Sequence, residues 1–484
     1  MSILRRLLGD AVVYSLTPIL SSFVGFVLVP IYTRTFTPSD YGALALVNTT
    51  TTLATIFVVF GLDNSSAVWF WEYPDPEERR RTFSTWLAFT CSFSILIAAV
   101  AITFRSTLAH WILREDRLSG LWAVFGINLI ALNIPRIGIL WFRMTRSPWR
   151  AVLLGALTSV GSAAFGVYFV VHLKLGLAGV IAGQAAGAWI GTIVTFIALR
   201  KVFSPRAVNR ARLPPMLRLS APLVAMTNLS WLMGGAVSYF ISFVCSREDA
   251  GLYQVANSLA SVLGLLMFAF DQAWSPIALS IRDVPTARRV YGVAVEGAFV
   301  IGLLLAFGAA VFARPALLVI TQPQYVSGQW VLGLLALNIA LINIPSVLSV
   351  TFAREKVTMP LAKATAGGAA VTVVLLPILA KTLGKEGAAL AVLIGTITIL
   401  TLSIRASQRV FPIDIHFRRA AGATLLAAGW TAAFLATRPL VATSLTAMIV
   451  VGALLVLSLA GALGAIYRNP LREAWRESRA PTAR

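Results

Sequence analysis

The stretch LNIPRIGILWFRMTR, Leu132 to Arg146, has a second copy 210 residues later, INIPSVLSVTFAREK, Ile342 to Lys356. At this offset the identical residues are Asn128, Asn133, Ile134, Pro135 and Phe142, which meet Asn338, Asn343, Ile344, Pro345 and Phe352. Identities at offsets of 208 and 209 pair Gly42 with Gly251, Asn48 with Asn257, Asp63 with Asp271, Gly179 with Gly387 and Gly187 with Gly395. The chain is therefore a duplication whose two copies run in the same order.

The composition predicts an integral membrane protein. Of the 484 residues, 58% are hydrophobic and only 12% are charged, which is outside the range of a soluble domain. Fourteen apolar runs have about 20 residues, the length of a helix that crosses about 30 Å of hydrocarbon. The first run follows a basic start but lacks a small-residue cleavage site, so it predicts a retained span and not a signal peptide.

Basic residues are distributed unevenly between the two sides that alternate along these spans. One side, which includes both termini, carries 28 lysines and arginines and the other side 10, while Arg136 and Lys363 remain inside spans. The positive-inside rule therefore predicts that both termini are cytoplasmic. The net charge of +21 would suggest nucleic acid binding in a soluble chain, but here no basic stretch is interleaved with aromatic residues on a soluble domain. We expect no nucleic acid partner.

These patterns predict an all-α protein with fourteen transmembrane helices. Residues 1–210 and 211–410 would form two six-helix lobes, and residues 411–484 would hold helices 13 and 14 and a cytoplasmic tail. An even number of spans in each copy makes the repeat parallel, with its pseudo-two-fold axis along the membrane normal. Two such lobes around a central cavity are the architecture of a transporter.

Span 6 has glycine at every fourth position from 179 to 191, which lets another helix approach closely. The copy in span 12, Gly387, Ala391 and Gly395, favours packing within the lobe over a dimer interface. We therefore expect a monomer.

Motifs for covalent chemistry are missing from the sequence. It has no GxxxxGK[ST] loop, no HExxH and no aspartate pair spaced to hold a metal-bound nucleotide sugar. His110, His172 and His416 are far apart, and the spacing of Cys91 and Cys245 suggests neither a disulfide nor a metal site. We expect neither an enzyme nor a cofactor. An H⁺ or Na⁺ gradient, the membrane potential or the substrate gradient would then drive the protein.

The start of each copy carries a recognisable pattern. SLTPILSSFVGFVLVPIYTRTFTPSDYGALALVNT, Ser15 to Thr49, is followed by VVFGLDNSSAVW, Val58 to Trp69, and the second copy has RLSAPLVAM and SREDAGLYQVANSLASV. The pattern has three parts: a first span with proline, a loop ending in Asp40, Tyr41 and Gly42, and a second span closing on Gly-Leu and a polar cluster. This pattern resembles the Wzx-type flippases of O-antigen and capsule repeat units. These belong to the multidrug/oligosaccharidyl-lipid/polysaccharide exporter superfamily.

The resemblance implies a substrate and a location. The substrate would be an oligosaccharide on a polyprenyl pyrophosphate, moved to the outer leaflet of the bacterial inner membrane for O-antigen, lipopolysaccharide, capsule or exopolysaccharide synthesis. Membrane lipids would be partners, with the polymerase and glycosyltransferases of the same pathway as further ones. Fourteen spans are similar to the lipid II flippase branch, where spans 13 and 14 are thought to form a groove for the lipid tail.

Polar residues inside spans are the candidate substrate site. On a helix Asn133, Arg136 and Arg143 lie at i, i+3 and i+10 and share one face, which predicts a wet cavity. Basic groups in this cavity would bind a pyrophosphate, and Arg136 is the best candidate. The other candidates for substrate binding are Arg143, Arg354, Lys363, Asn133 and Asn343. Ser346 replaces Arg136 in the second copy, so the cavity would be asymmetric. Alternatively, Arg136 snorkels to the cytoplasmic end or pairs with Asp63 or Asp271.

Acidic residues are candidates for a gate or for ion coupling. Asp63 and Asp271 occupy equivalent places near the cytoplasmic ends of spans 2 and 8, where they would seal an inner gate against arginines. Glu296 lies about ten residues into span 9 with few basic residues at its level, so it is the candidate proton or cation site.

Two other functions remain open at this point. A multidrug or small-cation antiporter of the same superfamily would share the fold, although Arg136 and Lys363 inside the spans disfavour a cationic substrate. A membrane polysaccharide polymerase or ligase is the enzymatic alternative, and the short external loops argue against it.

Overall fold

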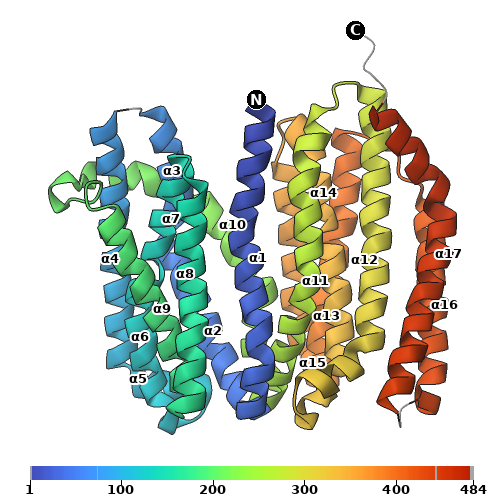
Figure 1. Ribbon diagram of the computed structural model, residues 1–484, viewed down its shortest axis with the longest axis horizontal. Coiled ribbons are helices and arrows are strands. Elements are labelled where there is room, and N and C mark those ends of the chain that lie inside the picture. Colours follow the sequence, from blue (N-terminus) through green and yellow to red (C-terminus); the bar gives the residue numbers. More distant parts are fainter. Residues whose placement is uncertain (1–2, 74, 442–443, 480–484) are drawn as a thin grey trace. The chain divides into compact units, whose positions relative to one another are not determined.

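The computed structural model describes residues 3–73, 75–441 and 444–479, and all the regular secondary structure in these ranges is helical (Figure 1). Residues 442–443 of the expected fourteenth span and 480–484 of the expected tail lie outside the described residues. The first half of the chain contains α1 (Ile3–Thr35), α2 (Pro38–Val59), α3 (Leu62–Glu72), α4 (Pro76–Thr103), α5 (Arg105–Leu108), α6 (Gly120–Leu132), α7 (Ile134–Met144), α8 (Pro148–Val167), α9 (Gly176–Ala198) and α10 (Leu213–Val244). The second half contains α11 (Arg247–Ser280), α12 (Val284–Ile320), α13 (Gln329–Ile342), α14 (Ile344–Arg354), α15 (Met359–Val410), α16 (Phe417–Val441) and α17 (Leu445–Arg479).

Twelve helical segments of the described residues are long and apolar enough to cross a membrane, or thirteen if the bent α10 counts as one span. The expected number of fourteen is not confirmed. When α10 is counted, the remaining difference between thirteen and fourteen lies in α15. Its 52 residues count as one segment, although Gly384 interrupts the helix with φ 64° and ψ −142°. At 1.5 Å per residue, α15 would be more than twice as long as the hydrocarbon layer is thick.

The chain divides into two compact units, Met1–Gly251 and Leu252–Arg484. In unit 1, α8 packs between α1 and α9, α6 packs against α4 and α9, and α10 lies against α2 and α3. In unit 2, α12 packs against α13, α16 and α17, while α15 packs against α13 and α14. The expected lobe boundaries at residues 210 and 410 stay a prediction.

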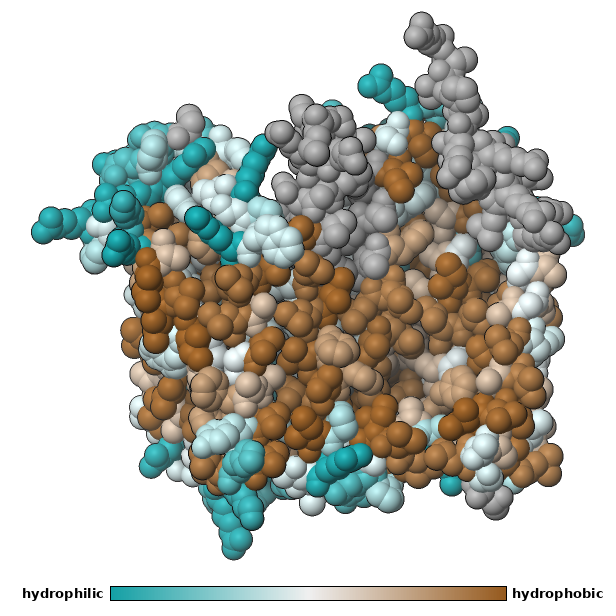
Figure 2. All heavy atoms as spheres, in the orientation of Figure 1, coloured by the Kyte–Doolittle hydropathy of each residue, from teal (hydrophilic) through white to brown (hydrophobic). Residues whose placement is uncertain are grey.

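Large apolar side chains face outward along the helices (Figure 2). Trp111 is 70% exposed, Leu153 69%, Leu425 74% and Leu440 81%. Monomeric soluble proteins rarely expose contiguous apolar surface of this extent. With the apolar helices, this surface identifies a multi-pass membrane protein.

The glycines shared by the two copies, Gly42 and Gly251, lie where two helix starts touch. A Cβ atom on Gly42 would meet the carbonyl oxygen of Arg247, and one on Gly251 would meet that of Pro38. Both clashes would be with backbone carbonyl groups, which cannot rotate away as a side chain can. The repeated glycine is therefore a packing requirement of the start of α2 and α11.

The glycines at every fourth position of α9 face α8 within the same unit. Gly183 lies against the backbone of Gly166, Gly187 against Ser162, and Gly191 against Thr158. Small residues on this face allow the two helices to pack closely. The stripe thus serves packing inside unit 1, as the sequence favoured.

Candidate functional site

Both copies of the Asn-Ile-Pro motif break their helix at the same place. Asn133 separates α6 from α7, and Asn343 separates α13 from α14. Pro135 and Pro345 stand in the first turn of the new helix, where a missing N–H costs least. A proline removes a backbone hydrogen bond from a helix interior, so the sequence predicts a bend at Pro135 and at Pro345, and the helix boundaries fall at these places.

Each break frees carbonyl groups, and the two units satisfy them differently. Pro135 cannot donate to the carbonyl of Ala131, which instead accepts a hydrogen bond from the Thr192 hydroxyl of α9 at 2.9 Å. In unit 2 the amide of Asn343 itself donates to the carbonyl of Ile339 at 2.6 Å. The amide nitrogen of Asn133 is buried and has no partner among the described residues.

A second break in unit 1 positions an acid opposite α7. Phe60 and Gly61 adopt left-handed backbone angles between α2 and α3, and the Ser220 hydroxyl donates to the carbonyl of Gly61 at 2.9 Å. Asp63 follows in the first turn of α3, where the helix dipole favours a negative charge. Its carboxylate accepts a hydrogen bond from the guanidinium of Arg136. Of the alternatives that the sequence left open, the pairing of Arg136 with Asp63 is the one found.

This ion pair lies at a cavity of about 410 Å³ inside unit 1. Arg143 lines the same cavity, together with Pro135. Helices α1 and α8 contribute four hydroxyl groups, those of Thr17, Ser21, Thr158 and Ser159. The Arg136 side chain is 51% exposed, whereas that of Asp63 is 18% exposed. The charged residues of the described lining are thus two arginines and one aspartate, with a summed charge of +1.

The sequence predicted only part of this lining. Asp63, Arg136 and Arg143 meet here as charged groups, but Asn133 is buried at the break and is not among the lining residues. Sequence reasoning missed the hydroxyl side, where Ser21 and Ser159 are 2.9 Å apart. Serine and threonine in apolar helices are common, and no signal in the sequence distinguishes these four.

The equivalent break in unit 2 lacks the ion pair. Ser346, the counterpart of Arg136, is exposed on α14, and Asp271 is half-buried on α11. No ion pair joins Asp271 to a residue that the structure describes. The two copies share the backbone break and differ in charge.

The other basic candidates lie in unit 2. The guanidinium of Arg354 donates to the carbonyls of Ile281 and Arg282 at 2.7 and 2.9 Å and lies over the Phe411 ring. The Arg354 side chain therefore stabilises the two carbonyl groups that directly follow α11. Lys363 is exposed in the second turn of α15.

Arg354 also acts on the neighbouring helix start. Asp283 precedes α12 and accepts a hydrogen bond from the backbone N–H of Thr286 at 2.9 Å. Hydrogen bonds from the Thr286 side chain and backbone, and then the charge of Arg354, lower the pKa of the exposed Asp283 carboxyl.

Glu296 has a basic neighbour that the sequence analysis did not expect. It is 2% exposed, and its Oε1 accepts hydrogen bonds from the backbone N–H of His416 at 2.6 Å and from the ring Nδ1 at 3.0 Å. His416 seemed isolated because 120 residues separate it from Glu296. The contact attaches the segment before α16 to α12.

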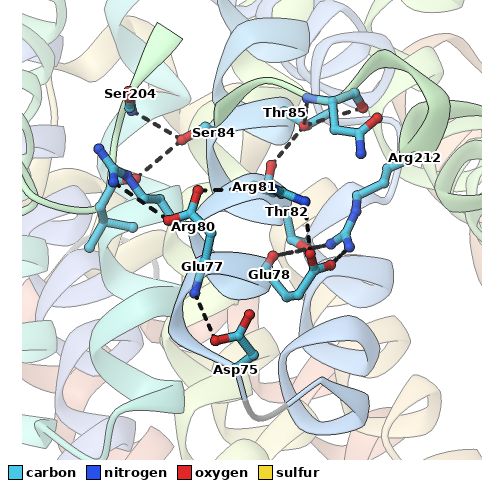
Figure 3. Close-up of polar contacts among 12 residues, drawn as sticks. Asp75, Glu77, Glu78, Arg80, Arg81, Thr82, Ser84, Thr85, Ser204 and Arg212 are labelled. Atoms are coloured by element: carbon cyan, nitrogen blue, oxygen red, sulfur yellow. Dashed lines mark hydrogen bonds and ion pairs between the residues drawn. The ribbon is translucent and has the colours of Figure 1, made fainter. Parts of the chain in front are cut away.

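A similar attachment exists in unit 1, where residues 199–213 return from α9 onto α4 (Figure 3). Arg212 forms an ion pair with Glu78 and donates to the Thr82 hydroxyl at 3.0 Å. The Ser84 and Thr85 hydroxyls accept hydrogen bonds from the backbone N–H groups of Ser204 and Asn209. In each unit, then, the chain that leaves one helix is fixed to another helix by polar contacts.

Comparisons with known proteins agree with this fold. Residues 7–281 match the family described as polysaccharide biosynthesis protein. A search by sequence among curated proteins found no match. Similar solved structures include the lipid II flippase MurJ in an inward closed conformation, with a TM-score of 0.72 and 14% identity over 96% of this chain and 100% of that chain.

Transporters of the multidrug resistance MATE family of the MOP superfamily are similar as well. An inward-facing structure has a TM-score of 0.66 and 16% identity over 82% of this chain and 97% of that chain. An outward-facing one has a TM-score of 0.59 and 15% identity over 84% and 94%. At these identities the likeness shows only that this chain shares the fold of these structures.

Proposed function

The chain belongs to the polysaccharide biosynthesis protein family, and from this membership and the basic cavity of unit 1 we infer that it translocates a polyprenyl-pyrophosphate-linked oligosaccharide. The substrate moves from the cytoplasmic to the outer leaflet of the bacterial inner membrane by alternating access. The product supplies the synthesis of a cell-surface polysaccharide such as O-antigen or capsule. No covalent bond of the substrate is made or broken.

The observation that carries this proposal is that the described lining of one cavity holds two arginines and one carboxylate. A pyrophosphate presents several anionic oxygens, and a guanidinium binds two of them with parallel hydrogen bonds. Arg136 is half-exposed, so it is accessible from the cavity. The hydroxyls of α1 and α8 supply further donors for phosphate or sugar oxygens.

Asp63 gives the cavity a resting partner for Arg136. Without substrate the carboxylate neutralises the guanidinium, which would otherwise be costly in an apolar surrounding. A pyrophosphate competes for the same N–H groups and releases Asp63. The pair can therefore act as the inner gate that the sequence suggested for this acid.

The proposed topology has fourteen crossings with both termini in the cytoplasm. Gly384 divides α15 into two crossings, and the bent α10 counts as one. Reporter fusions after Arg210 should then report a cytoplasmic position and fusions after Arg247 an external one. The opposite pattern would contradict this topology.

Transport of an anion out of the cell is helped by the membrane potential. With the inside negative, outward movement gains about 2.3 kcal/mol per charge per 100 mV. We further propose that Glu296 is the site where an H⁺ or Na⁺ ion would couple to the cycle. The candidates Asn343, Arg354 and Lys363 stay predictions for substrate binding, whereas Asn133 lies outside the cavity lining.

The direct test uses proteoliposomes that contain a labelled lipid-linked oligosaccharide. Arg136→Ala should reduce flipping to background at a normal protein level, and Arg136→Lys should retain part of it. Arg150→Ala removes an exposed arginine of α8 outside the cavity lining and should flip normally. Normal flipping by Arg136→Ala would overturn the proposal.

A cellular test separates this function from the other two. Deletion of the gene should remove surface polysaccharide and accumulate its lipid-linked intermediate on the cytoplasmic side. A polymerase defect would instead leave single repeat units at the outer face. If deletion changed only the sensitivity to cationic drugs, the chain would be an antiporter.

A further inference from the structure

Unit 1 contains a second, larger cavity that the proposed transport does not use. Its volume is about 760 Å³, and it lies between α4, α9 and the segment 199–213. Its apolar wall includes Leu87, Ala88, Cys91, Phe196 and Phe203. Arg200 and Arg210 stand on its lining as exposed cations.

The segment 199–213 forms a fixed roof over this cavity. Figure 3 shows Arg212 directed at Glu78, and the backbone of Ser204 directed at the Ser84 hydroxyl. A further bond of 2.9 Å joins the backbone N–H of Asn209 to the Thr85 hydroxyl. The roof is therefore attached to α4 along its length and forms one side of the cavity.

The second copy of the repeat has the same parts in unit 2. Asp75 and Asp283 cap α4 and α12 at an offset of 208, and Phe203 corresponds to Phe411 at that offset. The segment before α16 is attached to α12 as the roof is attached to α4, through Glu296 and His416.

In unit 2 larger side chains occupy the corresponding positions. Ala88 corresponds to Glu296 and Cys91 to Phe299, which packs against the buried core. Pro205 corresponds to Ile413, which is 4% exposed in that core. The fold thus does not require a cavity here, and the small residues of the first copy keep it open.

The charge of the segment 199–213 indicates which kind of ligand the cavity binds. Between Leu199 and Leu213 the sequence has five basic residues and no acid. The nearest acids of α4, Glu77 and Glu78, are bound by Arg80, Arg81 and Arg212. Arg200 and Arg210 are in no described ion pair, so an anionic group from outside the chain would complement them.

We propose that this cavity binds one anionic phospholipid, with an acyl chain against the apolar wall and the phosphate at Arg200 and Arg210. The lining lies on Ser84 to Cys91 of the candidate span Pro76–Thr103 and at the end of the candidate span Gly176–Ala198, so the apolar walls of two candidate spans meet the basic segment 199–213 here. Basic pockets between transmembrane helices bind anionic headgroups in this way. The lipid would hold the connection that leads from α9 to α10.

Cys91 provides a direct measurement, because it is a free thiol in the cavity wall. The full chain is placed in nanodiscs of phosphatidylcholine with or without phosphatidylglycerol, and maleimide labelling of Cys91 is quantified by peptide mass spectrometry. Phosphatidylglycerol should slow this labelling severalfold. Arg200→Gln/Arg210→Gln should abolish the effect, whereas the control Lys381→Gln/Arg405→Gln removes two exposed charges of unit 2 and should keep it.

A second measurement does not depend on the thiol. Native mass spectrometry of the detergent-solubilised chain should detect one retained phosphatidylglycerol in the wild type. Cys91→Phe introduces the side chain of the second copy and should remove that lipid, while an unchanged melting temperature shows that the variant folds. Retention of the lipid by folded Cys91→Phe would overturn the proposal.

Two other results would contradict the proposed ligand. Equal protection of Cys91 in phosphatidylcholine alone would show that the charge of the headgroup has no role. Equal protection by inorganic phosphate in the absence of phosphatidylglycerol would show that the site takes a free anion and not a lipid.

Discussion

The breaks at Asn133 and Asn343 have the same backbone and different chemistry. Both helices stop at asparagine and resume with Ile-Pro, but only the first break is followed by an arginine, which pairs with Asp63. In the second, Ser346 and Asp271 form no ion pair among the described residues. The duplication therefore supplies the bent helices twice, whereas the charge that can recognise a substrate is present once. Symmetry of the backbone does not predict symmetry of binding.

The largest effect should come from reversing the charge at the first break. Arg136→Asp puts a second carboxylate next to Asp63 and should reduce flipping to background. Ser346→Asp makes the matched change in the other copy and should reduce flipping by less than about tenfold, which corresponds to 1.4 kcal/mol. Flipping assays in proteoliposomes measure both. Equal losses would show that the two breaks contribute alike.

The swapped variant Asp63→Arg/Arg136→Asp sharpens the same comparison. It retains one guanidinium and one carboxylate in the cavity and should recover part of the activity lost in Arg136→Asp. No recovery would show that the position of the guanidinium on α7 is essential.

The next effect concerns Glu296, which has no acidic counterpart in unit 1. Glu296→Ala leaves the backbone N–H of His416 without its acceptor and should lower the free energy of unfolding by about 1–3 kcal/mol. Glu296→Gln keeps an acceptor oxygen, so its stability should change less while its transport cycle slows. Thermal unfolding in detergent and flipping assays separate the two roles, with the exposed Glu77→Gln as the control.

Dissipating the membrane potential at a constant pH gradient should slow the wild type and Glu296→Gln alike. If Glu296→Gln flips at the wild-type rate, Glu296 only attaches the segment before α16 and couples no ion. If neither the loss of the membrane potential nor Glu296→Gln changes the flipping rate, the substrate gradient alone would drive transport.

A smaller effect, on the free energy of unfolding, should distinguish Asn343 from Asn133. Asn343→Ala removes the hydrogen bond to the carbonyl of Ile339 and should lower the free energy of unfolding by about 1 kcal/mol. Asn133→Ala removes an amide whose nitrogen has no described partner and should change stability less. Thermal unfolding of the two variants measures the difference. The reverse order would show that Asn133 has a partner in the membrane.

The smallest effect is the pH dependence of Asp283. Its pKa is lower in the folded chain than the value of about 3.9 in an unfolded one. The ionised carboxyl therefore stabilises the fold above that value, and the contribution is lost as the pH falls through the lower folded pKa. Below pH 4 the melting temperature should fall slightly more for the wild type than for Asp283→Asn. Parallel curves would show that the cap contributes nothing.

The sequence predicted the class of protein, the duplication and both helix breaks, because apolar runs and proline act locally. It also identified Asp63, Arg136 and Arg143, since charges inside apolar helices are rare and conspicuous. The span count depends on whether Gly384 divides α15 into two crossings, as the apolar runs of the sequence predict. The contact between Glu296 and His416 joins residues far apart in the chain, and local patterns carry no information about it.

The hydrogen bond from Thr192 to the carbonyl of Ala131 restricts how the first break can move. A hinge with a free carbonyl could open into a wet cavity at little cost, but here opening would separate α6 from α9 or expose an unpaired acceptor. The end of α6 and the middle of α9 should therefore travel as one rigid body. Since α9 continues into the roof segment 199–213, a swing of the bent helix would pull on the connection to α10.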